Sequence, residues 1–160
     1  MNGVSVRVPA TSANLGPGFD CLALALDLYN EVRMRPVDDG IRVDVQGEGA
    51  ASLPHDENNL VAQAALRAFE SLDERPPGLD IHCHNRIPLG SGLGSSAAAV
   101  VAGLTAANAL VEGDMGDEEL LFLAFALEGH ADNAAAALNG GLNLVRARPA
   151  ELIVRKVPIP

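Results

Sequence analysis

The residues best suited to chemistry form a glycine-rich run at residues 88–98, with the sequence PLGSGLGSSAA. Glycines let backbone amides approach phosphate oxygens closely, and a helix that starts just after them adds unpaired N–H groups with partial positive charge. This composition favours a loop that binds a nucleotide phosphate, with a serine hydroxyl placed to reach a metal-bound phosphate. The alternative is a strand-to-helix turn in which Ser95 or Ser96 is an ordinary N-cap.

The spacing of the glycines separates this run from two common nucleotide motifs. A P-loop has the pattern GxxxxGK[ST], but no lysine follows Gly94 here. A dinucleotide-binding turn has the pattern GxGxxG, and here the third glycine comes one residue early. The sequence therefore disfavours both a P-loop NTPase and a dinucleotide-binding fold.

A second group of polar residues lies near the N-terminus, in residues 9–20 (PATSANLGPGFD). A loop stiffened by glycine and proline could hold a small zwitterion, with the carboxylate of Asp20 facing an ammonium group and the amide of Asn14 hydrogen-bonding a hydroxyl. A capped structural turn explains the same composition equally well.

A third group occupies residues 128–133 (EGHADN). One histidine beside two carboxylates has too few ligands for a zinc site. A magnesium ion held by one carboxylate, a serine and phosphate oxygens fits these residue types better. The alternative is that Asp132 or Asn133 caps the next helix and that His130 lies on the surface.

The glycine-rich run resembles the ATP-binding signature of the GHMP kinases, a superfamily of small-molecule kinases, at eleven consecutive positions. The resemblance implies that ATP is the co-substrate, that Mg²⁺ accompanies it, and that the protein is a phosphotransferase acting on an alcohol. It also implies the residues that bind ATP: Pro88, Leu89, Gly90, Ser91, Gly92, Leu93, Gly94, Ser95, Ser96, Ala97 and Ala98, with Asn59, the expected cap of a helix, near the adenine.

The other two groups resemble motifs of the homoserine kinases within that superfamily. Residues 128–133 match the third motif, although Ala131 stands where proline is usual, and Gly140 and Gly141 follow as in the family. The resemblance implies that Ser96 and Glu128 hold Mg²⁺. Those two residues and Asn133 would be the catalytic residues, and L-homoserine would be held by a further set: Asn14, Asp20, His130 and Asn133.

Asn133 carries a consequence for the mechanism that this resemblance implies. Mevalonate kinases have an aspartate base at the corresponding point, whereas an amide cannot abstract the alcohol proton. The expected reaction is direct in-line attack of the homoserine hydroxyl on the γ-phosphate without a strong protein base, giving O-phospho-L-homoserine for threonine biosynthesis. The alternatives are another GHMP kinase, such as a mevalonate-type one, or a catalytically silent nucleotide-binding fragment.

The pattern of apolar residues indicates which elements must position these groups. Apolar residues that alternate with polar ones predict strands near residues 4–8, 21–34 and 41–45, with a loop at 11–20 and hairpin connections between strands. Helices are predicted over about residues 58–72, 95–111 and 117–128, the last capped by Asp117 and central to the core, with a shorter one after residue 133. Further strands are expected at 79–83, where His82 and His84 face solvent, at 142–145 and at 152–157.

These elements predict an α+β fold with a mixed, largely antiparallel sheet covered by helices on one face. The resemblance implies the fold of the GHMP kinase N-terminal domain, which is ribosomal protein S5 domain 2-like. Homoserine kinases are nearly twice as long as this chain, so residues 1–160 would be the N-terminal ATP-binding domain and the C-terminal GHMP domain would be absent. Such a domain alone is expected to show little or no turnover.

Composition narrows the range of partners. The 160 residues include 11 Lys and Arg against 21 Asp and Glu, a formal charge of -10 without a basic cluster. Nucleic acid and membranes are therefore not expected as partners. The two cysteines lack CxxC spacing, which favours a reduced, cytoplasmic protein, and a homodimer is compatible with the sequence.

Overall fold

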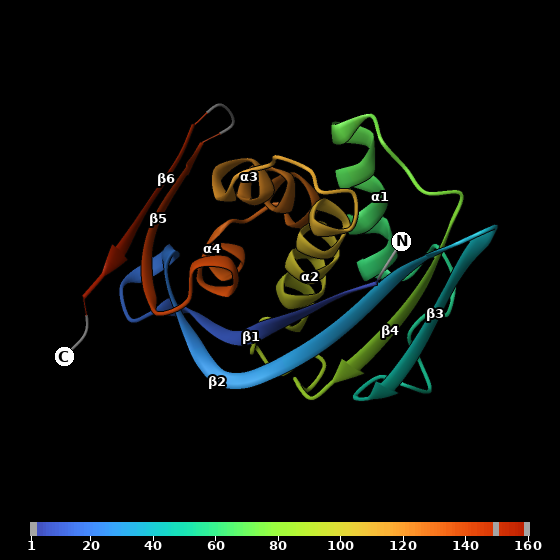
Figure 1. Cartoon of the computed structure of the whole chain (residues 1–160). Coiled ribbons are helices and arrows are strands. Elements are labelled where there is room, and N and C mark those ends of the chain that lie inside the picture. Colours follow the sequence, from blue (N-terminus) through green and yellow to red (C-terminus); the bar gives the residue numbers. More distant parts are fainter. Residues whose placement is uncertain (1–2, 149–150, 159–160) are drawn as a thin grey trace.

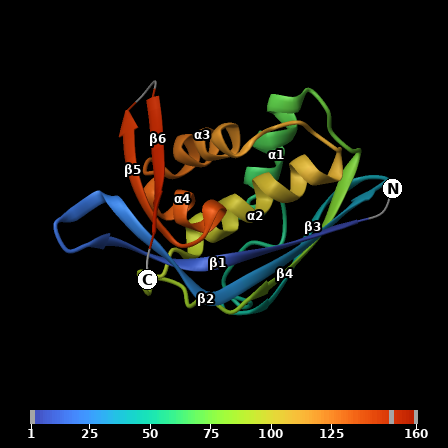
Figure 2. The same ribbon diagram turned by 60° about the vertical axis from the view of Figure 1, so that its left-hand side comes forward.

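A computed structural model describes residues 3–148 and 151–158, in which four helices cover one face of a six-stranded sheet (Figures 1 and 2). The strands are β1 (Val4–Leu15), β2 (Gly18–Val37), β3 (Gly40–Gly47), β4 (Gly78–Asn85), β5 (Leu142–Arg148) and β6 (Glu151–Val157). The helices are α1 (Leu60–Leu72), α2 (Ser95–Leu110), α3 (Asp117–Glu128) and α4 (Asp132–Asn139). The predicted fold class is confirmed. None of these helices in the described ranges is long and apolar enough to cross a membrane.

The long strand β2 organises the sheet. It pairs with β1 along most of its length, with β4 through its C-terminal part and with β5 through residues 22–24, all antiparallel. The prediction of hairpin connections between consecutive strands is wrong for β2 and β3. Strand β4 lies between them, and β3 pairs with β4 in parallel. Because α1 connects β3 to β4, the chain returns in the same direction, as a strand–helix–strand unit requires.

The predicted loop at residues 11–20 is largely a β-hairpin. Residues 11–13 pair with residues 23–25, and the pairing register shifts between Pro9 and Thr11 and again between Ala13 and Leu15. Such bulges bend a strand and re-aim its side chains. Asn14 and Asp20 both have positive φ angles, of 57° and 52°. The polar and glycine residues that suggest a loop in the sequence therefore form the bulges and the turn of this hairpin.

Helix α2 lies at the centre of the helical layer, where it packs on β1 and β2 and contacts α1, α3 and α4. The helix is buried on most sides, which explains why its own alanines occur all around its circumference. Gly103 marks its closest approach to α1, because a Cβ atom there would collide with the carbonyl oxygen of Val61 and lie 2.8 Å from Cβ of Ala64. The start of α1 is fixed by Asn59, as predicted, whose Oδ1 accepts a hydrogen bond from Val61 N at 3.0 Å.

Helix α3 differs from its prediction in two respects. Its N-cap is Gly116 rather than Asp117, and the carboxylate of Glu119 accepts a hydrogen bond from the amide of Gly116 at 3.0 Å. It also lies at the side of the helical layer rather than at its centre, so that Phe122 is 46% exposed and Leu127 is 38% exposed. An apolar circumference therefore does not by itself show that a helix is central.

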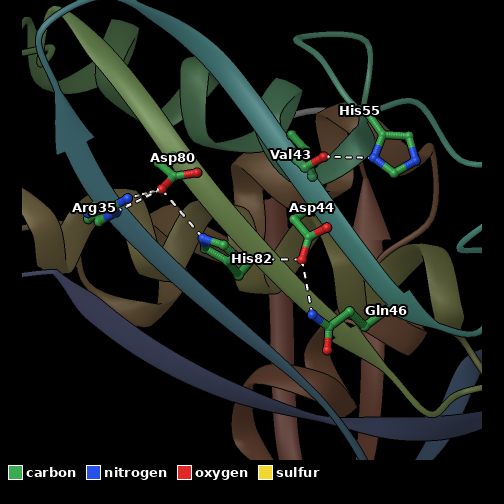
Figure 3. A network of polar contacts seen from close by, with 7 residues as sticks. All are labelled: Arg35, Val43, Asp44, Gln46, His55, Asp80 and His82. Carbon is green, nitrogen blue, oxygen red and sulfur yellow. Dashed lines mark hydrogen bonds and ion pairs between the residues drawn. The ribbon is translucent and has the colours of Figure 1, made fainter.

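The helix-free face of the sheet carries a network of charged side chains (Figure 3). Nε of Arg35 on β2 donates to Asp80 Oδ2 on β4 at 2.7 Å. His82 lies between two carboxylates, 3.4 Å from Asp80 Oδ2 and 3.4 Å from Asp44 Oδ2. These pairs join β2, β4 and β3 across the sheet. Within the described residues no group of three potential ligands gathers around a metal position, so His82 and His84 form no candidate metal site.

The outer edge of β3 is covered by His55 (Figure 3). The amide of Val43 donates to the backbone oxygen of His55 at 3.0 Å, and ring Nδ1 of His55 lies 2.9 Å from the oxygen of Val43. Both backbone groups that Val43 presents at this edge are therefore paired, which protects the edge strand from pairing with another chain.

The charge network makes a prediction about the pH dependence of stability. Burial raises the pKa of Asp80, but the contacts with Arg35 and His82 outweigh it and hold the pKa below its usual value of 3.8. A carboxylate with a lowered pKa in the folded state stabilises the fold above its unfolded pKa and loses that contribution as the pH falls through its folded pKa. We expect Asp80→Asn to lower the urea midpoint at pH 7 and to differ little from the wild type near pH 2.

The measurement is urea unfolding followed by circular dichroism at several pH values between 2 and 7, with Asp27→Asn, at an exposed carboxylate of β2, as the control. A difference between Asp80→Asn and the wild type that stays constant over this pH range would contradict the ionic role of Asp80.

Candidate functional site

The glycine-rich run connects β4 to α2 and adopts a conformation that favours glycine. Gly90, Gly92 and Gly94 have φ angles of 65°, 75° and 67°, which L-residues with side chains rarely adopt. Gly94 is itself the N-cap of α2 and makes no side-chain cap. The alternative with Ser95 or Ser96 as the N-cap is therefore wrong, because both serines lie inside the helix. Their hydroxyls are thus not used in capping.

Gly94 lies at the tightest point of the run. A Cβ atom at this position would collide with Oγ1 of Thr11 and lie 3.1 Å from Nδ2 of Asn133. At Gly90 and Gly92, by contrast, a Cβ would meet no atom within 4 Å. The first two glycines leave open space beside the loop backbone, whereas the third lets three chain segments meet.

Hydrogen bonds from the sheet hold both ends of the run. Asn30, a buried residue of β2, accepts hydrogen bonds on Oδ1 from the amides of Arg86 at 2.7 Å and Ile87 at 3.0 Å. At the other end the amide of Thr11 donates to the oxygen of Leu93 at 3.0 Å. Sequence reasoning assigned no role to Asn30. Asn30 falls in the inward-facing alternation of Leu28, Val32 and Met34. An amide at such a position was the feature that could have revealed it, because buried polar groups need partners.

The structure brings Ser96 and Glu128 together from 32 residues apart. Oγ of Ser96, at the start of α2, donates to Oε2 of Glu128, at the end of α3, at 2.6 Å. The Glu128 side chain is 8% exposed, whereas Ser96 is exposed and opens the pair to solvent. Adjacent ligands of an octahedral Mg²⁺ lie about 3.0 Å apart, given bonds of about 2.1 Å. The two oxygens lie somewhat nearer to each other than that, because a hydrogen bond joins them, and a small movement apart would let them hold a magnesium ion completed by water and phosphate oxygens.

The residues after Glu128 form a second polar cluster. His130 is half-exposed, with Nδ1 at 3.3 Å from Asp132 Oδ1 and Nε2 at 3.9 Å from Glu128 Oε2. Asp132 is 2% exposed, and Oδ1 also accepts from the amide of Asn133 at 2.8 Å. The buried Asp132 carboxylate is thus already used by its contacts with His130 and with the amide of Asn133. The prediction that Asp132 or Asn133 caps the next helix is wrong, because the N-cap of α4 is Ala131, without a side-chain cap, and both residues lie inside the helix. His130 lies at the surface, as that alternative also predicts.

The side chain of Asn133 points to β1. Its Nδ2 donates to Oγ1 of Thr11 at 2.8 Å, across a separation of 122 residues. This contact joins the N-terminal motif to residues 128–133 beside Gly94. Sequence reasoning included Thr11 in the motif but gave it no role, since nothing in the local pattern indicates a partner so far along the chain.

Asn14 and Asp20 lie on the hairpin between β1 and β2, and both are exposed. Oδ1 of Asn14 accepts from the amide of Asp20 at 2.8 Å, which fixes the two relative to each other. Among the described residues, neither makes a hydrogen bond or ion pair with His130 or Asn133. The structure therefore separates the four predicted homoserine-binding residues into two groups, Asn14 and Asp20 on the hairpin of β1 and β2, and His130 and Asn133 at the start of α4.

Asn59 lines a cavity of about 130 Å³ together with Ser95, Ser96, Leu89 and Cys83. The side chain of Asn59 is fully used, because Oδ1 caps α1 and Nδ2 donates to the oxygen of Pro54 at 2.8 Å. Burial, with a further contribution from Asp44, raises the pKa of the Cys83 thiol to about 12. A neutral thiol and largely apolar walls next to the start of α2 suit an uncharged ring better than a phosphate.

Comparison with known proteins identifies the family of this chain. The GHMP kinases N terminal domain matches residues 59–141. The homoserine kinase of Streptomyces avermitilis is 49% identical over 170 residues, which cover 98% of this chain and 56% of that protein. The homoserine kinase of Caldanaerobacter subterraneus is 52% identical over 141 residues, covering 88% and 45%. The chain thus spans about half the length of these curated relatives.

Solved structures show the same relation. A homoserine kinase from Cytophaga hutchinsonii superposes with a TM-score of 0.87 at 41% identity, covering 100% of this chain and 53% of the other. A putative homoserine kinase from Listeria monocytogenes gives 0.85 at 36% identity, covering 99% and 55%. The mevalonate kinase of Methanococcus jannaschii gives 0.77 at 18% identity, covering 98% and 56%, which shows a shared fold alone.

The contrast between Gly94 and Gly92 yields a prediction. We expect Gly92→Ala to lower the free energy of unfolding only by the cost of a positive φ angle at alanine, about 1 to 2 kcal/mol. Gly94→Ala adds the same cost and also the collision with Thr11, so we expect a total loss of about 2 to 4 kcal/mol in the free energy of unfolding. Urea denaturation of both variants measures the difference. Equal destabilisation would show that the contact between Gly94 and Thr11 is not tight.

Proposed function

Since the chain belongs to the GHMP kinase family, we propose that it is the ATP-binding domain of a homoserine kinase, which transfers the γ-phosphate of ATP to the hydroxyl of L-homoserine. The observation that carries the proposal is the pairing of Ser96 with Glu128 at the end of the glycine-rich loop, beside Asn133 at the start of α4. Relatives named homoserine kinase at about half identity support the choice of substrate.

The nucleotide would bind through the backbone of residues 88–98. The first turn of α2 contains no acidic residue, so its free amides and the positive end of the helix dipole face the phosphates without competition. This local field allows a chain with a net charge of -10 to bind a polyanion. The cavity lined by Asn59 lies next to this helix start and is where we place the adenine.

Mg²⁺ would be held by Ser96 and Glu128, and when bound it supplies neutralisation of the phosphate charge. The fold sets the distance between the two oxygens and buries the Glu128 carboxylate. In the structure the Ser96 hydroxyl donates to Glu128, so the same two oxygens would serve as the ligands.

The homoserine pocket would use both pairs of polar residues. On the hairpin, the Asp20 carboxylate would face the ammonium group, held in place by the bond from its own amide to Asn14. On the other side, His130 and Asn133 would line the pocket near the phosphates. We propose that a second domain of the GHMP type completes this pocket, since the curated relatives are about twice as long as the matched region.

The transfer would proceed without a strong protein base. Asn133 has no basicity, the Asp132 carboxylate is 2% exposed and hydrogen-bonded, and the Glu128 carboxylate would be used by the metal. A loose transition state needs positioning and charge neutralisation more than proton abstraction. The hydroxyl would attack the γ-phosphate in line, and its proton would pass to phosphate or water.

The product would be O-phospho-L-homoserine, and we propose that the protein serves threonine biosynthesis in the cytoplasm. A homodimer is compatible with this role, and the role would need neither nucleic acid nor a membrane.

The substrate is tested by coupled assay of ADP release with homoserine and with mevalonate, using the complete natural polypeptide. We expect turnover with homoserine and none with mevalonate. The kcat should not depend on an ionised protein base near neutral pH, because Asn133 cannot act as one. Turnover with mevalonate alone would overturn the assignment of the substrate, and a kcat that requires such a base would overturn the mechanism.

The magnesium pair is tested by calorimetry on the 160-residue chain. We expect Ser96→Ala and Glu128→Gln each to weaken binding of MgATP at least about tenfold, since each removes an oxygen ligand or its charge. Binding of ATP in EDTA should change by less than about threefold, because the loop amides remain. Ser71→Ala on α1 and Glu118→Gln at the start of α3, both exposed and outside the proposed site, are the matched controls. Equal losses with and without Mg²⁺ would argue against metal binding by these residues.

A further inference from the structure

Thr11 occupies an unusual position for a polar side chain, because it is completely buried and yet lies at the edge of the proposed catalytic site. It is 0% exposed, whereas Asn133, its hydrogen-bond partner, is half-buried. Its backbone amide is bonded to Leu93 of the glycine-rich loop and its hydroxyl to Asn133 on α4. One residue of β1 therefore contacts both the nucleotide loop and the residue expected to face the acceptor hydroxyl.

The contact between Thr11 and Asn133 determines the orientation of the Asn133 amide. Since Nδ2 donates to Oγ1 of Thr11 at 2.8 Å, the planar amide places Oδ1 on the side away from Thr11. Within the described residues Oδ1 accepts no hydrogen bond. One N–H of Nδ2 is thus engaged with Thr11, and the free carbonyl oxygen can accept a hydrogen bond from an alcohol.

The position of Thr11 is itself constrained. Its hydroxyl lies so close to Gly94 that a Cβ atom on Gly94 would collide with it, and the strand register shifts between Pro9 and Thr11. The bulge re-aims the Thr11 side chain towards the helical layer, and Gly94 provides the space that it needs. These constraints leave the hydroxyl little freedom to move away from Asn133.

We propose that Thr11 is a positioning residue for phosphoryl transfer: it holds the Asn133 amide so that Oδ1 accepts the hydrogen bond of the substrate hydroxyl, which aims the oxygen lone pair at the γ-phosphate. The inference rests on the proposed function for the reaction, but the orientation of the amide can be tested without turnover. Thr11 touches no substrate atom in this role and acts through Asn133.

The first test measures the orientation of the amide in the 160-residue chain by NMR. The side-chain amide signals of Asn133, assigned by their loss in Asn133→Ala, should exchange slowly with water. Thr11→Val keeps the shape but removes the acceptor oxygen, so we expect the signals to shift and to exchange at least about tenfold faster. Thr11→Ser keeps the hydroxyl and should resemble the wild type. Unchanged signals in Thr11→Val would overturn the inference, whatever the substrate is.

The second test is a double-mutant cycle in the complete natural polypeptide, with homoserine. We expect Thr11→Val to lower kcat about 10- to 100-fold with little change in KM, and Thr11→Ser to stay within about threefold of the wild type. In an Asn133→Ala background, Thr11→Val should add less than about twofold, because Thr11 acts through Asn133. Independent, multiplicative effects would show a general structural role and overturn the proposal.

Controls separate the possible failures. Thermal unfolding of each variant shows whether it is folded, and Thr11→Ala supplies a second removal of the hydroxyl if Thr11→Val does not fold. Absence of homoserine turnover in the wild-type polypeptide would contradict the proposed function, and the NMR result would still decide whether Thr11 orients Asn133.

Discussion

The architecture of the site depends on one close approach, in which the backbone of Gly94 lies against the hydroxyl of Thr11. A side chain at Gly94 would separate β1 from the start of α2, and the φ angle of 67° at this position further favours glycine. Because Thr11 also binds Asn133, the same point fixes the start of α4. The N-termini of two helices and the end of the glycine-rich loop are thus brought together around one atom of β1.

The small side chains of α2 extend this constraint through the domain. With alanine on nearly every side, the helix can approach β1, β2, α1, α3 and α4 at once, and Gly103 brings the backbones of α1 and α2 closest. Larger side chains would fill the same volume but would push the neighbouring elements apart. The position of α3 on this helix in turn places Glu128 within 2.6 Å of Ser96. Packing far from the loop therefore determines the geometry of the proposed metal site.

Much of the fold follows from local sequence patterns, whereas pairing between distant segments does not. Alternating valines and the period of α1 are local, and the structure has strands and a helix where they predict them. The insertion of β4 between β2 and β3 depends on pairing across more than 30 residues, which a turn at residues 38–40 does not reveal. The hairpin in residues 11–20 was missed for a related reason, since bulges use the same residues as loops. Motifs identified the parts of the site, but only the fold shows that Thr11 joins them.

An amide at position 133 is consistent with the electrostatics of this domain. The site would already contain the carboxylates of Glu128 and Asp132 beside a triphosphate, in a chain with a net charge of -10. A carboxylate at position 133 would add a further negative charge next to the γ-phosphate and would be stabilised only if a cation lay beside it. The partner in the structure is the neutral hydroxyl of Thr11, which an amide can use as an acceptor without any charge. Thr11 and Asn133 therefore form a matched neutral pair, and that pairing favours transfer by positioning over transfer by proton abstraction.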